Sequence, residues 1–274
     1  MGASVILLGT GTPSIDPSRS GPSVAVIVDN TPYLVDFGPG VVRRAIEAGL
    51  KPSQLTRGFL THLHSDHTAG YPDLILTPAV DGRTSRLVVY GPKGLQSMTN
   101  HILAAYEEDI RERVDGLEPA NPESYVVECH EIDNDTPGIV YQDERVSVEA
   151  FPVVHGSWPA YGYKFTSADR TIVISGDTAP TPVLVERARD CDVLIHEVYS
   201  AIALKDRTAD WIRYHTSVHT STHELAEIAS QSKPKLLVLY HQLFWSRSET
   251  ELLQEIKSRY GGKIVSGKDL DVFF

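Results

Sequence analysis

The chain contains little cysteine. Cys129 and Cys191 are the two cysteines among 274 residues, and they do not form a Cys-x-x-Cys pair. This spacing excludes the usual cysteine zinc motifs and a disulfide-dense framework. Both cysteines fall in apolar, strand-like segments, where cysteine typically behaves as a small buried hydrophobic residue. Cysteine usage therefore leaves the redox compartment of the protein open.

Long hydrophobic runs are also missing. The longest early apolar run, residues 5–8, is far too short to cross a bilayer and lacks the basic flank of a signal peptide. We therefore expect no membrane association. The start Met1-Gly2-Ala3 also fits a cloning remnant. The localisation thus stays open: cytoplasmic if the chain is complete, and exported if a signal peptide has been removed.

Positive charge is scarce relative to negative charge. The chain has 25 Lys and Arg against 36 Asp and Glu, a formal net charge of -11 at pH 7, and no basic run that could follow a phosphate backbone. These numbers argue against general affinity for nucleic acid. They do not exclude an anionic substrate, because two divalent cations in a pocket can dominate the local field.

The remaining composition is that of an ordinary globular protein, with 41% hydrophobic and 22% charged residues. Consecutive strands are predicted in the first half, and strands alternating with helices in the second, which favours a mixed α/β layering. We find no repeat and no low-complexity linker, so we expect a single domain over residues 1–274. Strands are predicted at residues 5–8, 24–28, 33–36, 58–61, 87–90, 146–151, 171–175, 192–196, 236–240 and 271–273.

Helix signals lie between some of these strands. One helix is predicted over residues 39–49 and a longer amphipathic one over residues 94–113. Two late helices begin with a Ser-x-x-Glu capping box, at Ser221 and at Ser248. The charged stretch 107–121 indicates a solvated surface excursion, with a substrate lid as the alternative.

The decisive segment is residues 58–70, which contains the pattern His-x-His-x-Asp-His at residues 62–67. In a chain of this composition, its chance occurrence is on the order of one in a thousand. In an extended loop after a strand, His62 and His64 point the same way and can reach one metal ion. Asp66 and His67 lie beyond the turn and can reach a second ion. Imidazole and carboxylate ligands suit zinc, and also manganese or iron.

Four ligands do not fill two metal sites, so further ligands are expected at the ends of later strands. His155, Asp177 and His241 each follow a strand-like run. A single histidine at a strand end is more often a satisfied polar residue than a ligand. Because all three come in this order after the first motif, we predict that they complete the two sites.

At this point the sequence resembles the metallo-β-lactamase superfamily, in the branch of arylsulfatase-like hydrolases and ribonuclease Z. The resemblance implies an αββα four-layer sandwich of two mixed β-sheets flanked by helices. It also implies that His62, His64 and His155 hold one metal, that Asp66, His67 and His241 hold the other, and that Asp177 bridges them. The resemblance rests on Leu8-Gly-Thr-Gly-Thr-Pro13, Val35-Asp36-Phe-Gly-Pro-Gly40, the His62 to His67 motif, His155 with Tyr161-Gly-Tyr163, Ser175-Gly-Asp177-Thr, His196-Glu197-Val-Tyr, His219-Thr-Ser and Tyr240-His241.

The same resemblance assigns further roles. His219 is expected to reach the pocket, oriented by Glu197, where it can donate a proton to the leaving oxygen or stabilise the charged transition state. Its alternative is an ordinary helix-capping residue. Asp36 is expected to orient a ligand histidine, and its alternative is a simple turn aspartate. The candidate catalytic residues are therefore Asp66, His219 and Glu197.

Two metal ions about 3.5–4 Å apart lower the pKa of a shared water from about 15.7 to about 7, so a bridging hydroxide is the expected nucleophile. No Gly-x-Ser-x-Gly elbow offers another nucleophile. We predict hydrolysis of a small-molecule ester: a sulfate ester, phosphodiester or lactone. Aromatic walls for it are offered by Trp158, Tyr161, Trp211, Phe244 and Trp245, with core packing as their alternative, and an anion-binding role by Arg207 and Arg213.

Three alternatives remain open. A ribonuclease Z-like phosphodiesterase is disfavoured by the net charge and by the short segment 156–176, where such enzymes usually carry a long arm for tRNA. A β-lactamase-like hydrolase and a non-hydrolytic metal or redox scaffold are the others. The predicted partner is thus a small molecule and not nucleic acid, and a homodimer is one option for the assembly.

Overall fold

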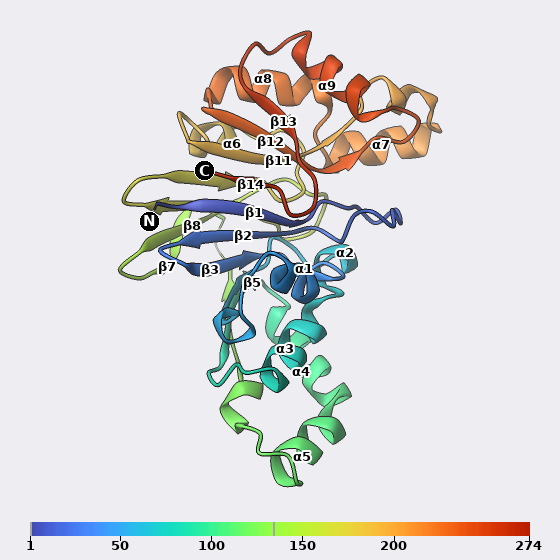
Figure 1. Ribbon diagram of the computed structural model, residues 1–274. Helices are drawn as coiled ribbons and strands as arrows, with labels where there is room; N and C mark the ends of the chain where they lie inside the picture. The colour runs from blue at the N-terminus through green and yellow to red at the C-terminus, as the bar shows by residue number, and fades with distance from the viewer. Residues whose placement is uncertain (1, 134) are drawn as a thin grey trace.

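The computed structural model describes residues 2–133 and 135–274. In this part of the chain, two seven-stranded sheets lie face to face, with helices on both outer faces (Figure 1). The predicted αββα sandwich of two mixed sheets is therefore confirmed. The assignment of all 274 residues to one domain stays a prediction, and Met1 lies outside the described residues.

The first sheet is built from the N-terminal half of the chain plus the last strand. Its strands are antiparallel from β14 to β3 and parallel from β3 to β6. In spatial order they are β14 (Val272–Phe273), β1 (Ser4–Gly9), β2 (Ser23–Val28), β3 (Thr31–Val35), β4 (Arg57–Phe59), β5 (Leu87–Pro92) and β6 (Val127–Ile132).

The second sheet, like the first, has a parallel part and an antiparallel part. Its strands are parallel from β13 to β10 and antiparallel from β10 to β7. In spatial order they are β13 (Ile264–Ser266), β12 (Leu236–Leu243), β11 (Val193–Tyr199), β10 (Thr171–Ile174), β9 (Tyr161–Ser167), β8 (Val146–Pro152) and β7 (Gly138–Gln142).

Strand periodicity produces the layers. In β1, Val5 and Leu7 point into the core between the sheets, whereas Ile6 and Leu8 pack against the helices on the outer face. In β11, Ile195 faces the same central core and Leu194 faces the helices on the opposite outer face. Because successive side chains of a strand alternate sides, a sheet that is apolar on both faces requires a layer on each face.

The helices belong to two groups. Helices α1 (Val41–Glu47), α2 (Ser65–Thr68), α3 (Tyr71–Val80), α4 (Leu95–Ala105) and α5 (Glu107–Asp115) follow strands of the first sheet. Helices α6 (Pro182–Arg187), α7 (Ala209–Val218), α8 (Thr222–Ser232) and α9 (Glu249–Lys257) follow strands of the second. The predicted capping boxes are present at the N-termini of α8 and α9. Short 3₁₀ turns lie at Pro52–Gln54, Pro122–Tyr125 and Ala203–Asp206.

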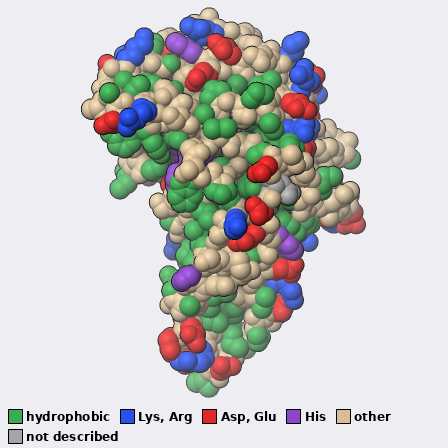
Figure 2. Space-filling view, turned by 180° about the vertical axis from the view of Figure 1, so that it is seen from behind, with side chains coloured by type: hydrophobic (Ala, Val, Ile, Leu, Met, Phe, Trp, Pro, Cys, Tyr) green, Lys and Arg blue, Asp and Glu red, His purple; other side chains and the backbone are tan. Residues whose placement is uncertain are grey.

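Helices α4 and α5 form an extension at the end of the molecule opposite α8 and α9 (Figure 1). The predicted helix over residues 94–113 is interrupted at Tyr106, whose φ of -110° and ψ of 14° are not helical. No residue of α5 is buried, and acidic and basic side chains mix at this tip (Figure 2). The predicted solvated excursion is therefore present, far from the strand ends. Within the described chain, no helix is long and apolar enough to cross a membrane.

Candidate metal centre

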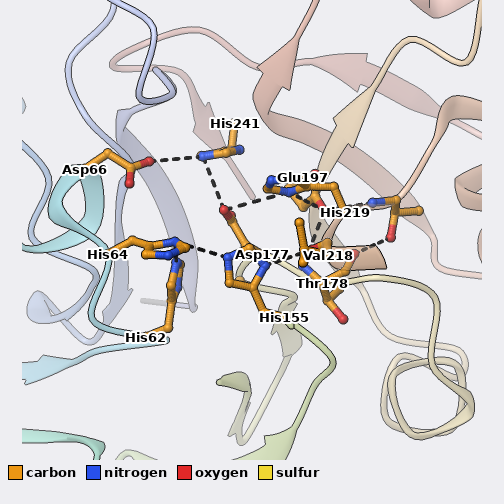
Figure 3. Close-up of polar contacts among 12 residues, drawn as sticks. His62, His64, Asp66, His155, Asp177, Thr178, Glu197, Val218, His219 and His241 are labelled. Atoms are coloured by element: carbon orange, nitrogen blue, oxygen red, sulfur yellow. Dashed lines mark hydrogen bonds and ion pairs between the residues drawn. The ribbon is translucent and has the colours of Figure 1, made fainter. Parts of the chain in front are cut away.

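All seven predicted ligands come together where strands of the two sheets end. Figure 3 labels each of them except His67. His62 follows β4, Asp177 follows β10, and His241 lies near the end of β12. Strands β10, β11 and β12 are parallel, so their carboxyl ends share one edge of the sheet. The side chains at these ends therefore converge although they are far apart in the sequence.

The first cluster contains three histidines. His62 Nε2 and His155 Nε2 each lie 3.1 Å from His64 Nδ1. The other ring nitrogen of His155 donates a hydrogen bond to the Val218 carbonyl oxygen over 2.8 Å. That contact determines the tautomer of His155 and leaves Nε2 free as a ligand atom. The cluster has the size and composition of a three-histidine metal site.

The second cluster combines imidazoles and carboxylates. Asp66 Oδ2 lies 3.4 Å from His67 Nε2 and 3.2 Å from His241 Nε2. The Asp177 carboxylate lies 3.5 Å from His67 Nε2 through Oδ1 and 3.4 Å from His241 Nε2 through Oδ2. His62, His67 and Asp177 also form a compact group. Asp177 thus lies between the two clusters, as a bridging ligand must.

Asp36 supports ligands of both clusters. Its carboxylate accepts a 2.8 Å hydrogen bond from His67 Nδ1 and a 2.9 Å hydrogen bond from the Thr61 hydroxyl. The Thr61 oxygen in turn lies 3.0 Å from His62 Nδ1. The expected contact between Asp36 and a ligand histidine is therefore present. Thr61, which the sequence did not single out, extends it to His62.

His241 is oriented by an irregularity in β12. The strand continues to Leu243, past the predicted end at residue 240, and carries one extra residue between Leu239 and Gln242 relative to β11. At this bulge His241 has a φ of 45°, an uncommon value for a residue with a side chain. Bulges re-aim side chains next to functional sites, which explains how a strand residue reaches the metal centre.

The donors fit cations. Burial lowers the pKa of His62 well below its ordinary value, and it also lowers the pKa values of His64 and His155. At His67, burial is outweighed by the carboxylates around it, chiefly Asp177, which raise its pKa well above the ordinary value. His67 Nε2 and Asp177 Oδ1 are buried without a hydrogen-bond partner among the described residues. Divalent cations require neutral imidazoles, as in the first cluster, and negative charge with unpaired donor atoms, as in the second.

His219 and Glu197 lie beside this centre as expected. His219 follows α7, and its Nδ1 lies 3.2 Å from Glu197 Oε1. Both side chains are buried. Burial opposes the charged form of His219, but Glu197 outweighs it and raises the pKa to about 9. The same Glu197 oxygen accepts a 2.9 Å hydrogen bond from the Thr220 amide, so the carboxylate is held in place.

The structure places only some of the predicted aromatic residues close to the site. Tyr161 is buried in the central core, and its hydroxyl donates to the Ile132 carbonyl oxygen. Phe244 lies under the guanidinium of Arg19. The rings that lie close to the site are Trp158, 4.7 Å from the His64 ring, and those of α7.

The predicted anion-binding arginines have other partners. Arg207 lies 4.9 Å from the Trp245 ring centroid, and Arg213 pairs with Asp210. His215, which had no motif context in the sequence, is buried 5.6 Å from the His219 ring, measured between centroids. Its spacing of four residues from His219 on a helical pattern was the available signal.

The fold and the paired clusters define a metal-dependent hydrolase of the metallo-β-lactamase fold. A family model described as beta-lactamase superfamily domain matches residues 31–242, and the chain belongs to this family. The predicted recognition and the prediction of a hydrolase are therefore confirmed. The divalent metals typical of this fold agree with the clusters.

Curated relatives are named ribonuclease Z. That of Mycobacterium sp. (strain KMS) is 34% identical over 242 residues, which cover 87% of this chain and 84% of the relative. That of Mycobacterium marinum is 31% identical over 272 residues, which cover 97% of this chain and 96% of the relative.

Solved structures show the same fold at lower identity. A metallo-beta-lactamase fold protein of Bacillus subtilis has a TM-score of 0.78 at 17% identity and covers 100% of both chains. Human tRNase Z, short form, has a TM-score of 0.74 at 23% identity, covering 99% of this chain and 98% of its own. At these identities the likeness supports the fold alone.

These relatives correct one prediction. The prediction of a small-molecule partner, with nucleic acid disfavoured by charge, is wrong, because relatives that match up to 97% of the chain are named ribonuclease Z. The physical reason is that a net charge of -11 describes the whole surface. Binding of a phosphodiester depends on the local field, which bound divalent cations dominate.

Proposed function

We propose that this protein is a phosphodiesterase that cleaves RNA, in the manner of ribonuclease Z. The observation that carries the proposal is the conjunction of ribonuclease Z relatives over nearly the whole chain with an intact pair of ligand clusters. The Glu197–His219 pair beside the clusters supports it further. This replaces the small-ester hypothesis with the alternative that the sequence had left open.

In this proposal the seven residues of the clusters are ligands. His62, His64 and His155 would hold one cation, Asp66, His67 and His241 would hold the other, and Asp177 lies within reach of both groups of ligands. Two divalent cations bound there would supply an activated water at neutral pH and would neutralise charge on the phosphate. The nitrogen and carboxylate donors suit zinc, with manganese or iron as alternatives.

His219 is proposed as the proton donor. Its Nδ1 is occupied by Glu197, so a proton on Nε2 is the one available to the leaving oxygen. Glu197 acts by holding the ring, and the Thr220 amide holds Glu197. Asp36 and Thr61 keep the imidazoles of His67 and His62 in the tautomers that direct Nε2 to the metals.

The test is cleavage of a precursor tRNA with a 3′ extension by protein loaded with zinc or manganese. Product mapping on a sequencing gel gives the cleavage position, and the same RNA with a phosphorothioate at that position reports metal contact with the phosphate. We expect one specific cut that is abolished by a chelator. Intact RNA after prolonged incubation with protein that holds two metal equivalents would reject the proposal.

A further inference from the structure

Trp158 places a partly exposed aromatic ring beside the metal centre. It is 44% exposed, and its ring centroid lies 4.7 Å from that of the ligand His64. A tight turn presents it: the Trp158 amide donates to the His155 carbonyl oxygen, and Gly156 has a φ of 66°. The turn that supplies ligand His155 thus also places Trp158 at the first cluster.

A second aromatic surface lies on α7, beside His219. Trp211 and Tyr214 are 52% and 41% exposed, and their ring centroids are 5.7 Å apart. Tyr214 lies 6.2 Å from the His219 ring. These residues are three positions apart on one helix, so both rings are on the same face.

Buried rings support this face from behind. His215 is 6% exposed and lies between Trp211, at 5.5 Å and 23° from parallel, and Trp245, at 4.8 Å. Neither ring nitrogen of His215 has a hydrogen-bond partner in the described part of the chain. The imidazole therefore serves as a flat packing element, and the α7 rings form a built surface.

The two surfaces flank the metal centre. His64 and His219 lie on opposite sides of Asp177 (Figure 3), with Trp158 against His64 and the α7 rings beside His219. A phosphodiester held by cations between the two clusters would carry one nucleoside on each side. Each nucleoside would therefore meet aromatic rings.

We infer that Trp158 on one side, and Tyr214 with Trp211 on the other, stack on the bases of the two nucleotides joined by the scissile phosphate. This inference rests on the proposed function. The sequence has no basic run that could follow a phosphate backbone, so stacking would add affinity that such a run does not supply. Stacking is independent of charge and tolerates any base, because every base has a π-face.

The test pairs protein variants with abasic substrates. Short RNA substrates carry either both bases or an abasic nucleotide on the 5′ or the 3′ side of the cut. For the wild type, each abasic site should lower kcat/KM about tenfold to hundredfold, mainly through KM. Trp158→Leu should lower kcat/KM similarly on intact RNA and be insensitive to one of the abasic sites. Tyr214→Leu should be insensitive to the other.

Matched controls exclude a general defect. Trp158→Phe keeps a ring and should retain most of the discrimination. Tyr106→Leu removes a ring that is also 41% exposed but lies between α4 and α5, so it should behave as the wild type. Metal content and thermal unfolding of each variant confirm the fold.

A binding measurement gives a second readout. The chain has three tryptophans, so Trp211→Phe with Trp245→Phe leaves Trp158 as the single indole fluorophore. Single-stranded RNA added to this protein without metal should quench its fluorescence. Unchanged abasic discrimination in both Leu variants, or absent quenching, would overturn the inference while RNA cleavage stands. Absence of any RNA cleavage by the wild type would overturn the proposed function and the inference together.

Discussion

The two halves of the metal centre reach similar geometry by different means. The first sheet contributes His62 and His64 from the loop after β4, and Asp66 and His67 from helix α2, which follows directly. The second sheet contributes His155, Asp177 and His241, each after or near the end of a different strand. The nearest donor atoms are 3.1 Å apart within the first cluster and 3.2–3.5 Å apart within the second.

The support of the two halves differs as well. In the first, side-chain hydrogen bonds from Asp36 and Thr61 orient His67 and His62. In the second, the φ of 45° at His241 and of 63° at Gly176 directs the backbone, and His155 is oriented by its hydrogen bond to the Val218 carbonyl oxygen. A contiguous motif therefore predicts a metal centre, whereas the packing of the two sheets brings the remaining donors to it.

The largest expected effect tests whether both halves are equally necessary. His67→Ala and His241→Ala each remove a donor of the second cluster, one from the motif and one from the bulge. Each should lose one of two metal equivalents and lower turnover about 10³-fold or more. Metal analysis and RNA cleavage measure both. His130→Ala, an exposed histidine of β6, is the control; full activity of His241→Ala would contradict the role of the second sheet.

A smaller effect separates ligands from the proton donor. His219→Ala should keep both metals while turnover falls about 10²–10⁴-fold, because the leaving oxygen departs without a proton. The turnover of Glu197→Gln should fall less, because the glutamine amide oxygen still accepts a hydrogen bond from the His219 ring. A substrate with a better leaving group, such as a nitrophenyl ester, should recover most of the rate in His219→Ala. Metal loss equal to that of His67→Ala would show that His219 is a ligand instead.

The next prediction concerns Asp36 and Thr61, whose side chains orient ligand histidines of the first sheet. Asp36→Asn replaces a carboxylate that accepts from both His67 and Thr61, and should weaken metal affinity about 10–100-fold. Thr61→Val removes the hydroxyl that links Asp36 to His62 but keeps the contact between Asp36 and His67, so it should weaken metal affinity less. Competition with a chromophoric chelator measures both. Equal affinities of Asp36→Asn and the wild type would leave Asp36 a simple turn aspartate.

The smallest effect concerns stability against pH. Burial, together with the positive charges of His219 and Arg207, lowers the pKa of His215 to about 4 from an ordinary 6.5. Between these values the unfolded chain binds a proton that the folded protein does not, so the free energy of unfolding falls as the pH falls. Between pH 7.5 and 5, His215→Phe should remove about 2 kcal/mol of that loss. Urea unfolding of metal-free protein at pH 7.5, 6 and 5 measures it; identical pH slopes would contradict the prediction.

Much of the fold was predictable because its signals are local. Alternating apolar residues in β1, and the capping boxes at Ser221 and Ser248, depend on neighbours in the sequence. The end of β12 and the interruption at Tyr106 were not predicted. A bulge is defined by the pairing of two strands, and a helix ends according to what packs on it.

The sequence by itself determined the ligand types, the spacing from His62 to His67 and the layered α/β class, since these follow from residue chemistry and short-range periodicity. Only the tertiary structure decided that Thr61 links Asp36 to His62, that Tyr161 belongs to the core, and that Trp158 and α7 flank the centre. Side chains from distant segments meet only when two sheets pack, and their distances follow from that packing alone.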